Sequence, residues 1–145
     1  LLGVFSPKWL IPVAKTLAEL GSEKVWVMYG EGLDEITITG TTQVAALENG
    51  RVNTFEITPQ DAGLPVHDLS QILGGDAQYN AAAMSRVLAG EPSAYRDIVL
   101  MNAGAAIYTS GAAESLSDGI DKARQSINSG AARQKLKDLC RLTNE

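Results

Sequence analysis

The spacing of apolar residues changes from helical to strand-like within the first thirty positions of the chain. Apolar side chains first recur every three or four residues, at Leu10, Val13, Ala14, Leu17 and Leu20. This spacing predicts an amphipathic helix that Ser6-Pro7 begins and Gly21 ends. Because an interior proline removes a backbone hydrogen bond, Pro12 requires the helix either to begin near Leu10 or to bend.

An uninterrupted apolar run, Val25 to Tyr29, follows between Lys24 and Gly30. Such a run is typical of a parallel strand that is buried on both faces. Ile36-Thr37-Ile38-Thr39 alternates apolar and polar residues instead, which predicts a half-buried strand. Further strands at 43–47 and 51–57, joined by an Asn49-Gly50 turn, predict an antiparallel meander with Phe55 and Ile57 on one face.

The remaining chain has helical periodicity. We expect one short and four long helices, at residues 68–73, 77–90, 93–110, 113–129 and beyond Gly130. The third of these is apolar nearly all round and should be buried, so Asn102 within it must find internal hydrogen-bond partners. In the last helix we expect Leu136, Leu139 and Cys140 to point inward.

Two adjacent carboxylates, Asp34 and Glu35, end the loop that follows the first strand. Gly30 and Gly32 can take positive φ and so give the loop the irregular backbone that would let the two acids converge. Ligands of open parallel sheets bind beyond the carboxyl ends of the strands. The pair could therefore hold a hydrated Mg²⁺ shared with substrate phosphates, although from this segment alone we favour a polar loop capped by acids.

Composition narrows the function classes. The 145 residues suffice for one domain with one core, and the net charge of -5 argues against binding to nucleic acid or an anionic membrane. No apolar run approaches the roughly 20 residues of a membrane span. The single cysteine, Cys140, excludes an intrachain disulfide and agrees with a cytoplasmic location. The apolar start Leu1–Phe5, without Met, leads us to expect a piece of a longer protein.

Other candidate residues have simpler explanations. His67, the single histidine, lies in a proline-rich loop and is expected to face solvent. Cys140 is interpreted as a small core residue rather than a reactive thiolate. Gly74-Gly75-Asp76 fits neither nucleotide fingerprint, and we favour Asp76 as a helix N-cap over a phosphate loop.

Several short motifs, taken in order, resemble the carboxy-terminal part of the anthranilate phosphoribosyltransferases. They are Gly3-Val4-Phe5-Ser6-Pro7, Gly30-Glu31-Gly32-Leu33-Asp34-Glu35, Asp61-Ala62-Gly63-Leu64, Gly74–Ala81, Met101-Asn102-Ala103 and Ser129-Gly130-Ala131-Ala132. The resemblance implies an α/β fold shared with the nucleoside phosphorylases, with a mainly parallel sheet, a β-hairpin and carboxy-terminal helices. Residues 1–145 would form the carboxy-terminal portion of the α/β domain, without the amino-terminal helical domain and the phosphate loop.

The resemblance also implies an activity. The family transfers the phosphoribosyl group of phosphoribosyl pyrophosphate to anthranilate in tryptophan biosynthesis, with Mg²⁺ as cofactor, and its members are usually homodimers. Its metal-binding Asp-Glu pair matches Asp34 and Glu35. Its pyrophosphate loop and its anthranilate-binding arginine precede the matched part, so we expect residues 1–145 alone to be inactive. Ala62 replaces an aromatic residue of the family pattern, which is a local change in packing from which no chemical consequence follows.

Two alternatives share this fold. A pyrimidine nucleoside phosphorylase would use phosphate as the nucleophile, but the Asp34-Glu35 pair and the hairpin after it favour the transferase. A non-catalytic homologue that binds nucleic acid would need a basic face, which the pI near 4.9 opposes.

Overall fold

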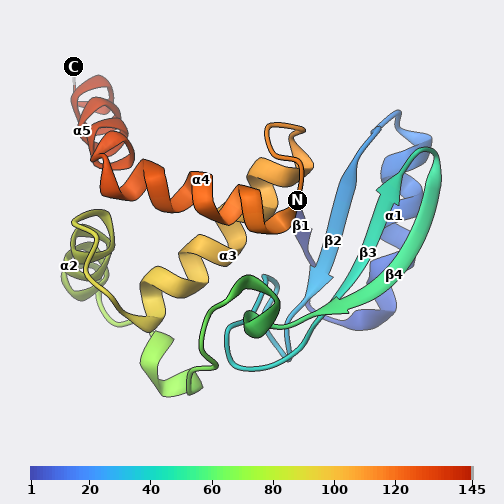
Figure 1. The fold of residues 1–145 in the computed structure, drawn as a ribbon, viewed down its shortest axis with the longest axis horizontal. Helices are drawn as coiled ribbons and strands as arrows, with labels where there is room; N and C mark the ends of the chain where they lie inside the picture. Colours follow the sequence, from blue (N-terminus) through green and yellow to red (C-terminus); the bar gives the residue numbers. More distant parts are fainter. Residues whose placement is uncertain (145) are drawn as a thin grey trace.

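The computed structural model describes residues 1–144, in which a sheet is followed by a group of helices (Figure 1). The first half contains β1 (Leu2–Gly3), a 3₁₀ turn (Pro7–Trp9), α1 (Leu10–Glu19), β2 (Val25–Tyr29), β3 (Thr42–Glu48) and β4 (Arg51–Ile57). The second half contains 3₁₀ turns at Pro59–Ala62 and Leu69–Ile72, then α2 (Ala77–Leu88), α3 (Ala94–Thr109), α4 (Leu116–Asn128) and α5 (Ala131–Thr143). The expected α/β class is confirmed.

The four strands form one mixed sheet in the order β1-β2-β3-β4. Strands β1 and β2 are parallel, with Leu2 opposite Val27. Strand β3 pairs antiparallel with both β2 and β4, so Ala45 lies between Val27 and Thr54. The expected meander is confirmed. Within residues 1–144 parallel pairing is confined to β1 and β2, so the sheet is mixed rather than mainly parallel.

Strand β2 is buried on both faces, as its unbroken apolar run predicts. Val25 and Val27 pack in a smaller core with residues of α1, including Ala14. Trp26 and Met28 point the other way, into the larger core that contains the buried side of α3. The larger core continues through the loop after β2 and into α4. Figure 1 shows α1 on one side of the sheet and the α3–α4 pair on the other.

Local signals for turns and helix ends agree with the structure. Helix α1 begins two residues before Pro12, so this proline lies in the first turn, where its missing N–H has no helical partner to lose. Asn49 and Gly50 take φ values of 52° and 73° and reverse the chain between β3 and β4. The Asp76 carboxylate accepts a hydrogen bond from the backbone N–H of Tyr79 at 2.8 Å and caps α2.

Two glycines allow α3 and α4 to approach closely. A Cβ on Gly119 would lie 2.2 Å from the carbonyl oxygen of Gly104, and a Cβ on Gly104 would lie 2.4 Å from Cγ1 of Ile120. No larger side chain fits at either position without displacing a helix. The glycines therefore serve close packing, and they set the distance between α3 and α4.

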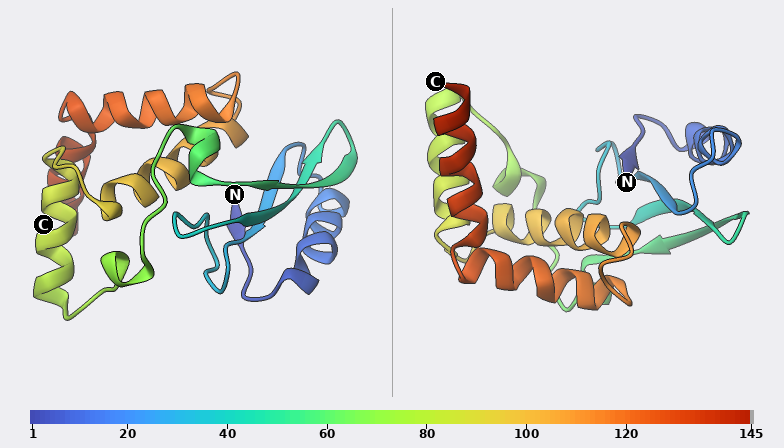
Figure 2. Two further views of the ribbon diagram at one scale, coloured as in Figure 1. Left: turned by 60° about the horizontal axis from the view of Figure 1, so that its bottom comes forward. Right: turned by 90° about the horizontal axis from the view of Figure 1, so that it is seen from above.

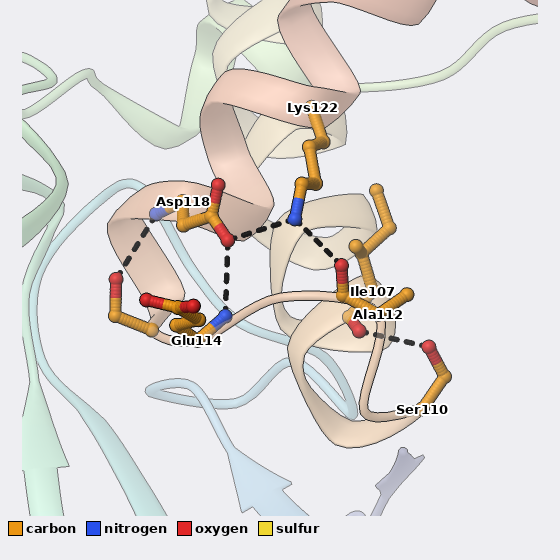
Figure 3. Close-up of polar contacts among 7 residues, drawn as sticks. Ile107, Ser110, Ala112, Glu114, Asp118 and Lys122 are labelled. Carbon is orange, nitrogen blue, oxygen red and sulfur yellow. Dashed lines mark hydrogen bonds and ion pairs between the residues drawn. The ribbon is translucent and has the colours of Figure 1, made fainter.

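The connection between α3 and α4 is held by polar contacts around Asp118 (Figure 3). Its Oδ2 accepts hydrogen bonds from the Glu114 backbone N–H at 3.0 Å and from Lys122 Nζ at 2.8 Å. Lys122 also donates to the carbonyl oxygen of Ala112 at 2.7 Å. These bonds tie the first turns of α4 to the chain that leaves α3.

Helices α2 and α5 lie side by side at the end of the molecule away from the sheet (Figures 1 and 2). Leu139 is 58% exposed and Cys140 is exposed, so the prediction that they point inward is wrong. The reason is that α5 contacts mainly α4 and α2, which leaves most of its surface uncovered. None of the helices in residues 1–144 combines the length and hydropathy that a membrane span requires.

Candidate functional site

The loop that carries Asp34 and Glu35 begins with a tight turn at the carboxyl end of β2. Gly30 and Leu33 exchange two backbone hydrogen bonds, of 2.9 and 3.0 Å. The two residues between them, Glu31 and Gly32, take φ values of 49° and 100°. Gly30, by contrast, does not have positive φ, so our expectation for that glycine is wrong. The turn sends the chain back across the carboxyl ends of β1 and β2.

Gly30 instead allows the backbone of Glu35 and Thr37 to approach the end of β2 closely. A Cβ on Gly30 would lie 2.5 Å from the carbonyl oxygen of Glu35 and 2.8 Å from the backbone nitrogen of Thr37. Gly3, in the neighbouring parallel strand, meets the backbone of Asp34 in the same way. The acidic segment thus lies directly on the carboxyl ends of β1 and β2, because β1 ends in Gly3 and Gly30 directly follows β2.

Asn102 of α3 holds the next residue of the loop. Its Oδ1 accepts a hydrogen bond from the Ile36 N–H at 2.9 Å, and its Nδ2 donates to the Ile36 carbonyl oxygen at 2.8 Å. Nδ2 also donates to the carbonyl oxygen of Ile98, at 3.0 Å. The predicted internal partners of Asn102 are therefore present, and one of them adjoins Glu35.

The segment Ile36–Thr39 is a loop, and the prediction of a strand there is wrong. Its backbone groups bond to side chains and to another loop: Thr37 N–H donates to Thr42 Oγ1 at 3.0 Å, and the Ile38 carbonyl accepts from His67 N–H at 2.9 Å. Thr37 is fully buried rather than solvent-facing, because its hydroxyl bonds to that of Thr39 at 2.7 Å. The alternation of apolar and polar residues therefore did not mark a buried and an exposed face.

Both acidic side chains are exposed, and within residues 1–144 no basic side chain lies at ion-pair distance from Asp34 or Glu35. Partial burial, and secondly the negative charge of Asp34, raise the pKa of the Glu35 carboxyl above its ordinary 4.5. Two repelling carboxylates without a cation favour the binding of one. A cation bound between Asp34 and Glu35 would therefore relieve the repulsion between their carboxylates.

The donor set fits Mg²⁺. Carboxylate oxygens are the hard ligands that Mg²⁺ prefers, and this ion commonly binds to one or two carboxylates while water and substrate phosphates complete its shell. No group of three or more His, Cys, Asp or Glu side chains in the described residues could hold a metal ion. Asp34 and Glu35 would accordingly supply two ligands of an open, substrate-completed site rather than a closed structural one.

His67 is a residue whose environment the sequence did not reveal. Its Nε2 lies 2.7 Å from Asp97 Oδ2, and both side chains are mostly buried, so the prediction of a solvent-facing histidine is wrong. The pair joins the loop after β4 to the first turn of α3. Nothing in the local sequence links these two residues, which are 30 positions apart. Their contact supports the loop that also holds Ile38.

The glycines before α2 do not form a phosphate loop. The Gly75 N–H donates to Asn80 Oδ1 at 2.9 Å, and Asn80 Nδ2 donates to the Gly75 carbonyl at 3.0 Å. The Gly75 N–H is thereby occupied within the protein. Together with the Asp76 cap, this agrees with the structural interpretation of the motif.

An α/β domain that presents two free carboxylates at the carboxyl ends of its parallel strands belongs to the open-sheet class that binds ligands at that edge. The comparison with known families is more specific. The family model described as "Glycosyl transferase family, a/b domain" matches residues 1–133. The chain belongs to this glycosyl transferase family.

Two relatives found by sequence are anthranilate phosphoribosyltransferases. The anthranilate phosphoribosyltransferase of Azorhizobium caulinodans is 57% identical over 144 residues, which are 99% of this chain and 42% of the relative. That of Brucella canis is 56% identical over 145 residues, which are 100% of this chain and 43% of the relative. The chain thus spans less than half the length of these relatives. The resemblance to the anthranilate phosphoribosyltransferases is confirmed.

Solved structures agree with the fold. The crystal structure of anthranilate phosphoribosyltransferase from Thermus thermophilus superposes with a TM-score of 0.88 at 37% identity, covering 95% of this chain and 41% of that one. The enzyme from Saccharomyces cerevisiae in complex with PRPP and Mg superposes with a TM-score of 0.84 at 29% identity, covering 93% and 40%.

Proposed function

We propose that this chain is part of an anthranilate phosphoribosyltransferase. The complete enzyme would transfer the phosphoribosyl group of phosphoribosyl pyrophosphate to anthranilate, giving N-(5-phosphoribosyl)anthranilate and pyrophosphate, in tryptophan biosynthesis. The observation that carries the proposal is the exposed Asp34–Glu35 pair, which lies on the strand ends in a domain whose relatives bear this name. A solved neighbour with PRPP and Mg supports the choice of substrate and metal.

In this proposal Asp34 and Glu35 bind and orient the metal and do not act as general bases. Bound at the pair, Mg²⁺ would supply Lewis-acid stabilisation of the negative charge that develops on the departing pyrophosphate. The two carboxylates stand on a loop that the strand ends and Asn102 hold in place. Their fixed positions would let the pyrophosphate group of the substrate bind in one orientation, with the ribose C1 toward the acceptor amine.

The proposal also concerns what lies outside this chain. Residues 1–145 would be the carboxy-terminal portion of the α/β domain, and the phosphate loop, the anthranilate pocket and a helical domain would lie in the preceding part. The coverage of the relatives, 42% and 43%, supports this, as does the position of β1 at the sheet edge, where an unpaired strand favours a further neighbour. Alone, the chain would be inactive.

Assembly and location follow from the same proposal. The full-length protein would be a homodimer that associates through the helical domain, and it would reside in the cytoplasm. The one cysteine, Cys140, is free, in agreement with a reducing compartment. Size-exclusion chromatography with light scattering would measure the dimer directly.

The activity can be tested on the full-length protein, meaning this chain joined to its preceding part. We expect Mg²⁺-dependent formation of phosphoribosylanthranilate and no phosphorolysis of thymidine. At limiting Mg²⁺, Asp34→Ala should lower turnover on the order of 10²-fold, by analogy with other single electrostatic groups. Phosphorolysis of thymidine by the wild type, or unchanged turnover of Asp34→Ala at limiting Mg²⁺, would overturn the proposal.

A further inference from the structure

Asn102 is the polar residue at the centre of an otherwise apolar helix face. Its neighbours Leu100, Met101 and Ala105 are fully buried. Its carboxamide uses three hydrogen bonds, of which one serves its own helix and two serve Ile36, 66 positions earlier in the chain. Hydrogen bonds within α3 could also satisfy the Asn102 carboxamide, so its two bonds to Ile36 need another explanation.

One of these bonds acts on the peptide group that follows the second acid, and the other acts on the next peptide group, between Ile36 and Thr37. The N–H that Asn102 accepts belongs to the peptide between Glu35 and Ile36, and the carbonyl of the same peptide is the Glu35 oxygen that packs against Gly30. Because a peptide group is planar, fixing its two ends fixes its orientation. The direction in which the Glu35 side chain leaves the backbone is thereby set by α3 on one side and by β2 on the other.

The fixed orientation opposes a repulsion. Asp34 and Glu35 are adjacent in the chain, so their negative charges repel, and a free loop would relax by turning the charges apart. Only an amide suits this clamp, because it accepts from the Ile36 N–H and donates to the Ile36 carbonyl at once. An aspartate in its place would lose the donor and add a third negative charge.

We propose that Asn102 is a positioning residue for the Asp34–Glu35 pair. It holds the two carboxylates in the arrangement that binds a divalent cation together with a diphosphate. This inference rests on the proposed function, because that function names the cation and the diphosphate substrate. Asn102 itself touches neither of them. It acts through the backbone of Ile36, and it couples the packing of α3 to the geometry of the metal site.

The chain contains a matched control. Asn80 clamps Gly75 with the same pair of hydrogen bonds, of 2.9 and 3.0 Å, at a helix end that carries no acidic pair. Asn80→Ala removes an equivalent clamp and should cost a comparable amount of stability. It should leave the acidic loop unchanged.

The test uses the full-length protein and three readouts. Amide hydrogen exchange measures the protection of residues 34–38, electron paramagnetic resonance measures Mn²⁺ binding with phosphoribosyl pyrophosphate present, and the assay gives the Mg²⁺ concentration for half-maximal turnover. Asn102→Ala should accelerate exchange in this segment, weaken Mn²⁺ binding about 10-fold or more and raise the Mg²⁺ requirement similarly, as expected when an outer partner of a metal ligand is lost. Saturating Mg²⁺ should restore most of the turnover. Asn80→Ala should change none of these values.

If Asn102→Ala does not fold, Asn102→Asp replaces it in the test, because it keeps the acceptor for the Ile36 N–H. Asn102→Asp should also weaken Mn²⁺ binding. Wild-type Mn²⁺ affinity in a folded Asn102 variant, or an equal loss in Asn80→Ala, would overturn the positioning role alone. A wild-type protein that binds no Mn²⁺ with phosphoribosyl pyrophosphate would overturn the proposed function and this inference with it. The two failures are therefore distinguishable.

Discussion

Gly3 in β1 lies in direct contact with the backbone of Asp34 in the loop after β2. A Cβ on Gly3 would lie 1.4 Å from the Asp34 carbonyl oxygen and 2.2 Å from its carbonyl carbon. The end of a two-residue edge strand therefore determines where the first acid of the candidate metal site stands. A position that sequence analysis treats as part of an apolar start has a defined role in the site.

Gly3→Ala should displace the acidic loop, because the added methyl group and the Asp34 carbonyl cannot occupy the same space. Overpacking of this kind costs about 1–3 kcal/mol in the free energy of unfolding. The Mn²⁺ affinity of the full-length protein should fall about 10-fold or more, as for other disturbed ligand supports. Urea unfolding and Mn²⁺ titration measure the two effects. The neighbouring exposed Leu2→Ala serves as control, and wild-type Mn²⁺ affinity in Gly3→Ala would contradict the prediction.

Glu35→Gln should make the metal-free protein slightly more stable at pH 7. The pKa of Glu35 is raised above 4.5 by partial burial and then by Asp34, so its charged form destabilises the folded state. The favourable contribution of the protonated group is complete below pH 4.5 and is lost as the pH rises through the folded-state pKa. The gain should be a few tenths of a kcal/mol, since solvent screens both acids.

Urea unfolding with EDTA at pH 7 and pH 4 checks this prediction, with Glu91→Gln, an exposed acid elsewhere, as control. The gain should vanish at pH 4. A Glu35→Gln protein that is less stable than wild type at pH 7 would show that the carboxylate has a stabilising partner.

Gly104→Ala should destabilise the protein, although glycine to alanine within a helix usually stabilises by about 0.5–1 kcal/mol. The sign reverses because the new Cβ would lie 2.4 Å from Ile120 Cγ1 and 2.8 Å from the Ile120 backbone nitrogen. We expect a loss of about 1–3 kcal/mol, measured by urea unfolding. Gln125→Ala, on the exposed side of α4, should cost far less. An increase in stability for Gly104→Ala would show that α3 and α4 are less closely packed than described.

Asp118→Asn should lower the melting temperature at neutral pH and should matter less in acid. The hydrogen bond from Lys122, followed by that from the Glu114 backbone, lowers the pKa of the Asp118 carboxyl below its ordinary 3.8. The stability that it contributes is present above pH 3.8 and is lost as the pH falls through the lower, folded-state pKa. Thermal unfolding of wild type and variant between pH 7 and pH 2.5 should give converging curves. A difference that stays constant over this range would contradict the role of the charge.

The parts of the fold that sequence could predict depend on neighbours in the chain. The Asn49-Gly50 turn, the Asp76 cap and the burial of β2 follow from backbone preferences and short periods, which act over a few residues. The acidic pair was found in the same way, as two carboxylates after a strand. The sequence shows the two charges, but it does not show that Gly3, Gly30 and Asn102 hold the segment that carries them.

The errors at residues 36–39 and at His67 have one physical cause, which is a polar partner that periodicity does not reveal. Thr39 and Thr42 bond to the buried Thr37, and Asn102, 66 positions away, holds Ile36, so residues 36–39 form a loop and not a strand. His67 is covered because Asp97 lies beside it. Periodicity reports which residues prefer burial, but not which partner makes burial possible for a polar group.

The central claim is that Asp34 and Glu35 together hold the divalent cation that a diphosphate substrate shares. The most direct test is a Mn²⁺ titration of the full-length protein with phosphoribosyl pyrophosphate present, in which electron paramagnetic resonance measures the bound Mn²⁺. Asp34→Asn/Glu35→Gln should abolish tight Mn²⁺ binding, whereas Glu23→Gln/Glu91→Gln, which removes the same charge from two exposed sites, should bind as wild type does. Unchanged Mn²⁺ binding by the Asp34/Glu35 double variant would contradict the claim.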